Sequence, residues 1–212
     1  MKPARRGGFF AGWRDVGGFF SDYWRAYGGW ISLSKSPYLH ISIVITGVTH
    51  PLWLAPDWWN VILSVIPSIL GFTIGGFAIV LALGTGDFGA ALSSASKPDQ
   101  DPLESGLGKL GAAFCHFIVV QFAAAVFAIL AMAFAKAPAP VFAPWLSNEI
   151  ARSIFWGFGW FLGIYSLSLA ISTTQWIFSS IKLLIRFQKL EEKKQVARKA
   201  IDQQQASERR KP

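Results

Sequence analysis

Residues 67–86 read PSILGFTIGGFAIVLALGTG, an apolar run that returns repeatedly to Ser, Gly and Ala. A helix in a soluble core would place larger side chains at those positions, because burying them stabilises the fold. Helices in a lipid bilayer associate through close van der Waals contact instead, and small residues let two backbones approach. The run therefore predicts a helix that packs against another helix inside a membrane.

If the helix begins at Trp58, small residues lie along one side of it. Their alternating spacings of four and three residues keep them on a single helix face. The face consists of Ser64, Ser68, Gly71, Gly75, Ala78, Ala82 and Thr85. Pro67 adjoins it and has no amide hydrogen to donate, so we expect a kink in this helix.

Two further apolar segments repeat the pattern. Small residues share a face at Gly159, Gly163, Ser166, Ala170 and Thr173, and again, with one amide side chain, at Gln121, Ala124, Ala128, Ala131 and Ala135. Faces of this kind serve either tight packing within one bundle or packing between copies, including a ring that surrounds a pore. The sequence leaves both uses open.

The composition is typical of a membrane protein. Of the 212 residues, 52% are hydrophobic and only 15% are charged, which is too little polar surface for an ordinary soluble domain. A helix of about 20 residues crosses a bilayer, and four apolar segments approach that length, at residues 38–54, 58–83, 110–135 and 154–181. We predict an all-α integral membrane protein with four transmembrane helices, although the short first segment could be re-entrant. No cleavable signal peptide is expected, because a long charged stretch precedes that segment.

Basic residues divide unevenly between the two sides of these segments. Eighteen of the 20 Lys and Arg lie before the first segment, in the loop at residues 84–109 or after the fourth segment; the other two are Lys136 and Arg152. The positive-inside rule then places both termini in the cytoplasm, with the protein in the plasma (inner) membrane. Topology and attraction to anionic lipid account for the charge. No nucleic-acid motif accompanies it, so nucleic acid is not an expected partner.

The two ends of the chain are expected to lie at the cytoplasmic surface. Within residues 1–37, Phe20, Trp24 and Tyr27 recur at helical spacing, which predicts an interfacial amphipathic helix. A docking surface for a partner is the alternative. Residues 182–212 predict a basic cytoplasmic helix and tail, whose apolar positions form barely three heptads.

Few side chains in this sequence are suited to catalysis or to binding a metal or cofactor. Two GxGxxG matches, at residues 84–89 and 106–111, adjoin apolar segments and lack the strand of a dinucleotide site. We expect no catalytic residue, no metal site and no cofactor, and the single Cys115 has no cysteine partner. His40 and His116 fall at a similar depth on two predicted helices, so they are candidate ligands of a b-type haem.

These patterns predict a non-enzymatic multipass membrane protein. Its small-residue faces favour an oligomerising membrane subunit, a scaffold or a pore. The expected partners are the lipid bilayer, further copies of the chain or other membrane subunits. A haem-binding or redox membrane subunit that uses His40 and His116 is the alternative function.

Overall fold

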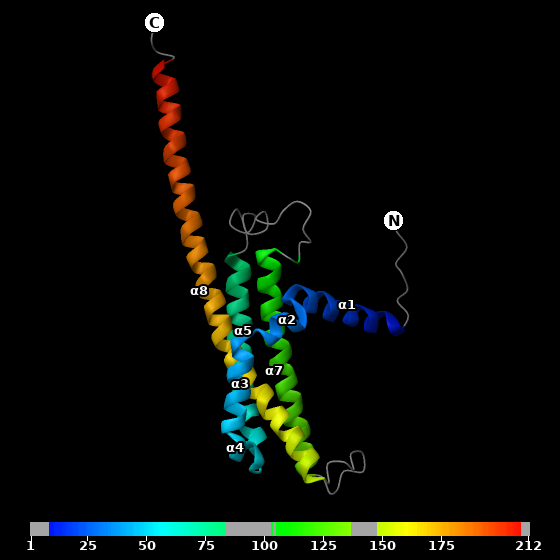
Figure 1. Ribbon diagram of the computed structural model, residues 1–212. Helices are drawn as coiled ribbons and strands as arrows, with labels where there is room; N and C mark the ends of the chain where they lie inside the picture. The colour runs from blue at the N-terminus through cyan, green and yellow to red at the C-terminus, as the bar shows by residue number, and fades with distance from the viewer. Residues whose placement is uncertain (1–8, 84–102, 104, 137–147, 209–212) are drawn as a thin grey trace.

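The computed structural model describes residues 9–83, 103, 105–136 and 148–208, and every regular element within these residues is a helix. Within these ranges, two short helices and five longer ones follow one another (Figure 1). Their bounds are α1 Phe9–Tyr27, α2 Gly29–Ser34, α3 Pro37–Val48, α4 His50–Leu54, α5 Trp58–Leu83, α7 Gly106–Lys136 and α8 Glu149–Glu208. The loop at residues 84–102, which includes Thr85 at the end of the small-residue face, lies outside the described residues.

Three of the described helices are long and apolar enough to cross a membrane. The three stretches are Trp58–Ala82, Gly108–Lys136 and Glu149–Gln203. The helices α5, α7 and α8, to which these stretches belong, contain three of the four segments that the sequence predicts.

The remaining segment, at residues 38–54, is divided into two helices. The helix α3 has 12 residues, and Thr49 separates it from α4. Pro51 is the physical reason, since it has no N–H for the carbonyl of Gly47 and its ring crowds the preceding turn. At 1.5 Å per residue α3 is about 18 Å long, against a hydrocarbon core of about 30 Å.

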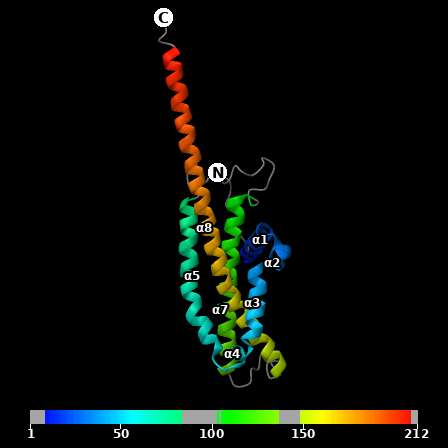
Figure 2. The same cartoon turned by 60° about the vertical axis from the view of Figure 1, so that its left-hand side comes forward.

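The helix α8 is at the centre of the bundle. It contacts α7 and α5, and it also contacts α3 and α4. Figure 2 shows α5 and α3 on opposite sides of the α7–α8 pair. The short α3 is tied to α8 by polar bonds, because Ser42 Oγ donates to Ser168 Oγ at 3.0 Å and the Tyr38 hydroxyl donates to Gln175 Oε1.

Tryptophan side chains fill the end of the bundle where α5 begins. Trp58 and Trp59 are 3% and 2% exposed, and both pack in one core cluster with Trp160. The indole of Trp160 donates to Thr49 Oγ1 at 2.9 Å, which fixes the α3–α4 corner against α8. Burial of such large aromatic surfaces is a major stabilising term at this end.

The helix α1 lies across the direction of the long helices (Figure 1). The chain turns between α1 and α2 at Gly28 and Gly29, whose φ angles of 94° and 62° favour glycine. Trp13, Val16 and Phe20 are exposed on α1, on the side opposite Arg14, Gly18 and Asp22 if each residue turns the helix by about 100°. At the other end of the chain, α8 continues well beyond α5 and α7.

Candidate functional site

The small-residue face of α5 points away from the rest of the described chain. Each of the residues Ser64, Ser68, Gly71, Gly75, Ala78 and Ala82 is exposed. A Cβ atom built on Gly71 or Gly75 would meet no heavy atom within 4 Å. Within the described residues, these glycines therefore do not serve packing inside the chain.

The buried side of α5 is the opposite one. Ile62, Thr73 and Val80 are 4%, 0% and 3% exposed. With about 100° per residue, their mean direction and that of the small residues differ by about 180°. The helix thus has one face for α7 and α8 and a second face that the described chain leaves uncovered.

Large side chains border the uncovered face on both sides. Val61, Phe72 and Ile79 follow one edge, and Ile74 and Leu81 follow the other; all are about half exposed. The face is consequently a shallow apolar groove with a floor of Ser, Gly and Ala. Such a floor with raised edges is the shape that accepts another helix at close distance.

The corresponding residues of α8 pack inside the chain. Gly159, Gly163 and Ser166 are buried, and Ala170 is half-buried. A Cβ on Gly159 would lie 2.7 Å from Trp58 Cη2, and a Cβ on Gly163 would lie 2.2 Å from Ile62 Cδ1. These glycines let α5 approach α8 closely.

The small residues of α7 also pack inside. Ala124, Ala128 and Ala131 are all 0% exposed, while Ala135 is exposed. Gln121 is completely buried, and its Nε2 donates to Thr73 Oγ1 at 2.9 Å. On α5, by contrast, a Cβ atom at Gly71 or Gly75 would meet no heavy atom within 4 Å.

Pro67 lies inside α5 and is exposed. It has no N–H for the carbonyl of Leu63. Figure 2 shows α5 bending in its first half, where this residue is found.

A second site surrounds His116, where α1 meets α7 and α8. The Tyr23 hydroxyl is 2.8 Å from Nδ1 of His116, and the Tyr165 hydroxyl is 3.0 Å from Nε2. A neutral imidazole donates from one nitrogen and accepts at the other. One tyrosine is therefore the donor and the other the acceptor, and the histidine joins three helices.

Aromatic contacts complete this junction. The ring of Tyr27 stacks on His116 with the ring centroids 4.1 Å apart. Burial raises the pKa of Tyr23 to about 12, and the neighbouring Tyr27 and Cys115 add to that shift. Burial also raises the pKa of Tyr27, so both phenols of α1 are neutral at physiological pH.

The structure places the two candidate haem ligands in different surroundings. His40 is exposed on α3, whereas His116 is 5% exposed. Both ring nitrogens of His116 are already hydrogen-bonded to tyrosines, and a haem ligand needs one of them for the iron. No hydrogen bond or ring contact between the two histidines is found among the described side chains.

The expected interfacial anchors have separate roles in the structure. Phe20 is 46% exposed, Trp24 is half-buried against Trp30, and Tyr27 stacks on His116. Sequence reasoning missed the role of Tyr23 as a partner of the histidine. The signal was its spacing of four residues from Tyr27, which puts both phenols on one side of α1.

No known protein family, no curated protein and no solved structure matches this chain.

Proposed function

We propose that this protein is a non-enzymatic, multipass membrane subunit that assembles with further copies of itself through α5. The proposal rests on the exposed small-residue face of α5, since a Cβ atom at Gly71 or Gly75 would meet no heavy atom of another described helix within 4 Å. In lipid, a helix gains from close packing and not from hydrophobic transfer. Lipid chains pack less closely into a narrow backbone groove than another helix does, so a second helix gains dispersion contacts there.

The packing of α5 on α8 supports the proposal, because this chain already uses small residues in that way. Gly159 and Gly163 receive the side chains of Trp58 and Ile62. The groove on the outer side of α5 offers the same type of surface, with Phe72 and Ile79 along one edge. A second copy would bring an identical groove and identical edges, as a two-fold interface requires.

A four-crossing topology with both termini in the cytoplasm is part of the proposal. In it, α3 and α4 cross together with α5, α7 and α8 in the inner membrane. Lys136 ends α7 and Arg152 lies in the first turn of α8, both at the end of the bundle away from α1. The sparse charge at that end fits the positive-inside rule.

A two-fold contact through α5 is compatible with a scaffold or a subunit of a larger complex, whereas a ring that encloses a pore would need a second, head-to-tail contact surface as well. Ion flux separates these possibilities. A constitutive pore would make reconstituted vesicles leaky, whereas a scaffold would leave them tight while the protein is inserted and oligomeric.

The experiment that tests the proposal replaces Gly75 by Ile. Because nothing lies within 4 Å of a Cβ there, we expect the monomer to fold normally while the assembly dissociates. Mass by size-exclusion chromatography with multi-angle scattering, together with thermal unfolding, measures both effects. The matched control is Phe122→Ala, which alters the exposed surface of α7 and leaves α5 unchanged.

The proposal fails if wild type is monomeric at all protein concentrations, or if Gly75→Ile retains the wild-type mass. A variant that unfolds would instead show that this face packs within the chain. Gly71→Ile, one turn earlier on the same face, serves as the second test.

A further inference from the structure

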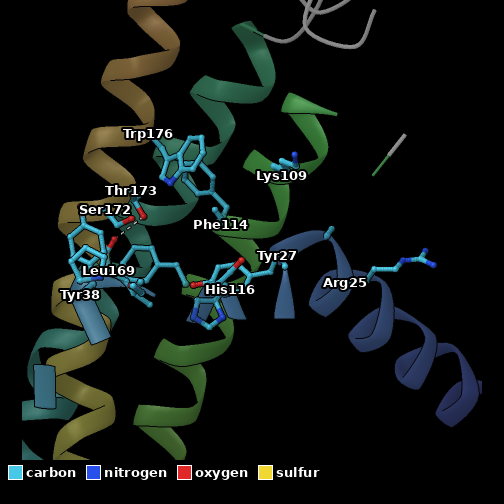
Figure 3. A pocket seen from close by; sticks show the side chains of 17 residues that line it. Arg25, Tyr27, Tyr38, Lys109, Phe114, His116, Leu169, Ser172, Thr173 and Trp176 are labelled. Carbon is cyan, nitrogen blue, oxygen red and sulfur yellow. Dashed lines mark hydrogen bonds between the residues drawn. The ribbon is translucent and has the colours of Figure 1, made fainter. Parts of the chain in front are cut away.

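A cavity of about 610 Å³ lies above the corner where α1 turns into α2 and α3. The helices α7 and α8 form its other walls (Figure 3). Its volume falls in the range typical of small-molecule sites. The 17 lining residues come from five helices or the turns between them, and none of these described residues is Asp or Glu.

The lining of the cavity combines apolar and hydroxyl-bearing side chains. Phe114, Phe117 and Leu169 supply apolar surface from α7 and α8. Ser32, Ser36 and Ser172 supply hydroxyl groups from α2, the α2–α3 turn and α8. This combination suits an amphiphile, whose chain contacts the apolar wall while its polar end accepts hydrogen bonds.

The charge at the cavity is positive. Lys109 is an exposed lining residue in the first part of α7. Arg25 also lines the cavity, but its guanidinium is 3.3 Å from the carboxylate of Asp22 and points away in Figure 3. Lys109 is thus the cation that a bound anion would meet.

The position of the cavity along the bundle indicates that it lies near the polar surface of the bilayer. It adjoins the end of α1, and α1 lies across the spans with Trp13, Val16 and Phe20 exposed. A helix of this type lies at the boundary between headgroups and acyl chains. A ligand reaching this cavity from the membrane would arrive with its headgroup at the height of Lys109.

We propose that this cavity binds a phosphate-bearing anionic amphiphile, namely an anionic phospholipid of the cytoplasmic leaflet. Its phosphate lies beside Lys109, the serine hydroxyls donate to headgroup oxygens, and its acyl chain runs along Phe117 and Leu169. Charged and hydroxyl donors are the groups that bind phosphate oxygens most strongly. The site is independent of the α5 groove, because its lining residues belong to other helices.

The test measures lipid binding by native mass spectrometry on the full-length protein in detergent. The probes are dioctanoyl phosphatidylglycerol and its zwitterionic counterpart, dioctanoyl phosphatidylcholine. We expect the anionic lipid to bind more tightly, and Lys109→Gln to weaken it about fivefold, as one basic residue at a membrane surface contributes. Lys136→Gln is the matched control, because it removes the same charge from the other end of α7.

Two further measurements test the shape of the cavity and the source of the phosphate. Ala113→Phe fills the cavity from α7 without changing any charge, so it should reduce binding of both lipids. Competition by inorganic phosphate distinguishes the sources: Lys109-dependent binding of phosphate alone would assign the site to a soluble phosphate compound and overturn the lipid assignment. Equal affinities for wild type, Lys109→Gln and Lys136→Gln would overturn the site itself.

Discussion

Replacing Gly159 by Ala tests how closely α5 and α8 pack. The added Cβ would lie 2.7 Å from Cη2 of Trp58 and 3.4 Å from Cζ2. An approach of that kind forces either the indole or the helix to move. Trp58 has little room to move, since its side chain is only 3% exposed. Its ring also packs edge-on against the rings of Trp59 and Trp160, with ring centroids 6.1 and 6.0 Å apart.

The size of the effect follows from two opposing terms. Overpacking a well-filled core costs about 1–3 kcal/mol. Replacing glycine by alanine in a helix interior returns about 0.5–1 kcal/mol. We therefore expect Gly159→Ala to lower the free energy of unfolding by about 1 kcal/mol, within a range of roughly 0–2.5 kcal/mol, and to lower the Tm by about 2–4 °C for each kcal/mol at this chain length.

Neighbouring glycines provide the comparisons. At Gly163 a small cavity of about 40 Å³ borders Ile62 and gives its side chain room to move, so Gly163→Ala should cost less than Gly159→Ala. At Gly75 nothing lies within 4 Å, so Gly75→Ala should be neutral or slightly stabilising to the monomer.

Thermal unfolding followed by tryptophan fluorescence in one detergent, at one protein concentration, measures all three variants. The expected order of Tm is Gly75→Ala highest, Gly163→Ala intermediate and Gly159→Ala lowest. If Gly75→Ala destabilised the monomer as much as Gly159→Ala, the division of α5 into a packed face and an uncovered face would be refuted.

Two further predictions concern the junction at His116. Tyr165→Phe removes the hydroxyl that is 3.0 Å from Nε2 and leaves a buried nitrogen unpaired, so stability should fall by about 1–3 kcal/mol; Tyr38→Phe, which removes an exposed bond, should cost less, and an equal loss for the two would refute the role of burial. Burial raises the pKa of Tyr23 from 10.0 to about 12, so the folded state favours the neutral phenol and its contribution is complete below pH 10 and lost as the pH rises towards 12. Thermal unfolding at several alkaline pH values should show this loss in wild type and a smaller one in Tyr23→Phe, and identical profiles would contradict it.

The sequence predicted the small-residue face of α5 but not the direction in which it points. In a soluble helix the polar side marks the surface, so the pattern itself gives the orientation. In a membrane helix both the lipid side and the protein side are apolar, and that marker is lost. Only the packing of Ile62, Thr73 and Val80 in three dimensions identifies the covered side.

At residues 38–54 the prediction followed the apolar composition and gave too little weight to a proline. The apolar character of the segment predicted one continuous span, yet Pro51 was visible in the sequence and divides the segment into α3 and α4. The junction at His116 lay beyond such local signals. Tyr23 and Tyr165 are 93 and 49 residues away from the histidine, so their contact depends on how α1 and α8 pack and not on spacing.

Disulfide crosslinking of single cysteines in native membranes tests the central claim most directly. Cys115 is first replaced by Ser, and cysteines are then introduced one at a time at Gly71, Gly75 and Ala78 on the groove and at Phe122 on the exposed side of α7. We expect covalent dimers from the three groove positions and none from the control. Absence of dimers at the groove, or equal yields at Phe122, would contradict assembly through α5.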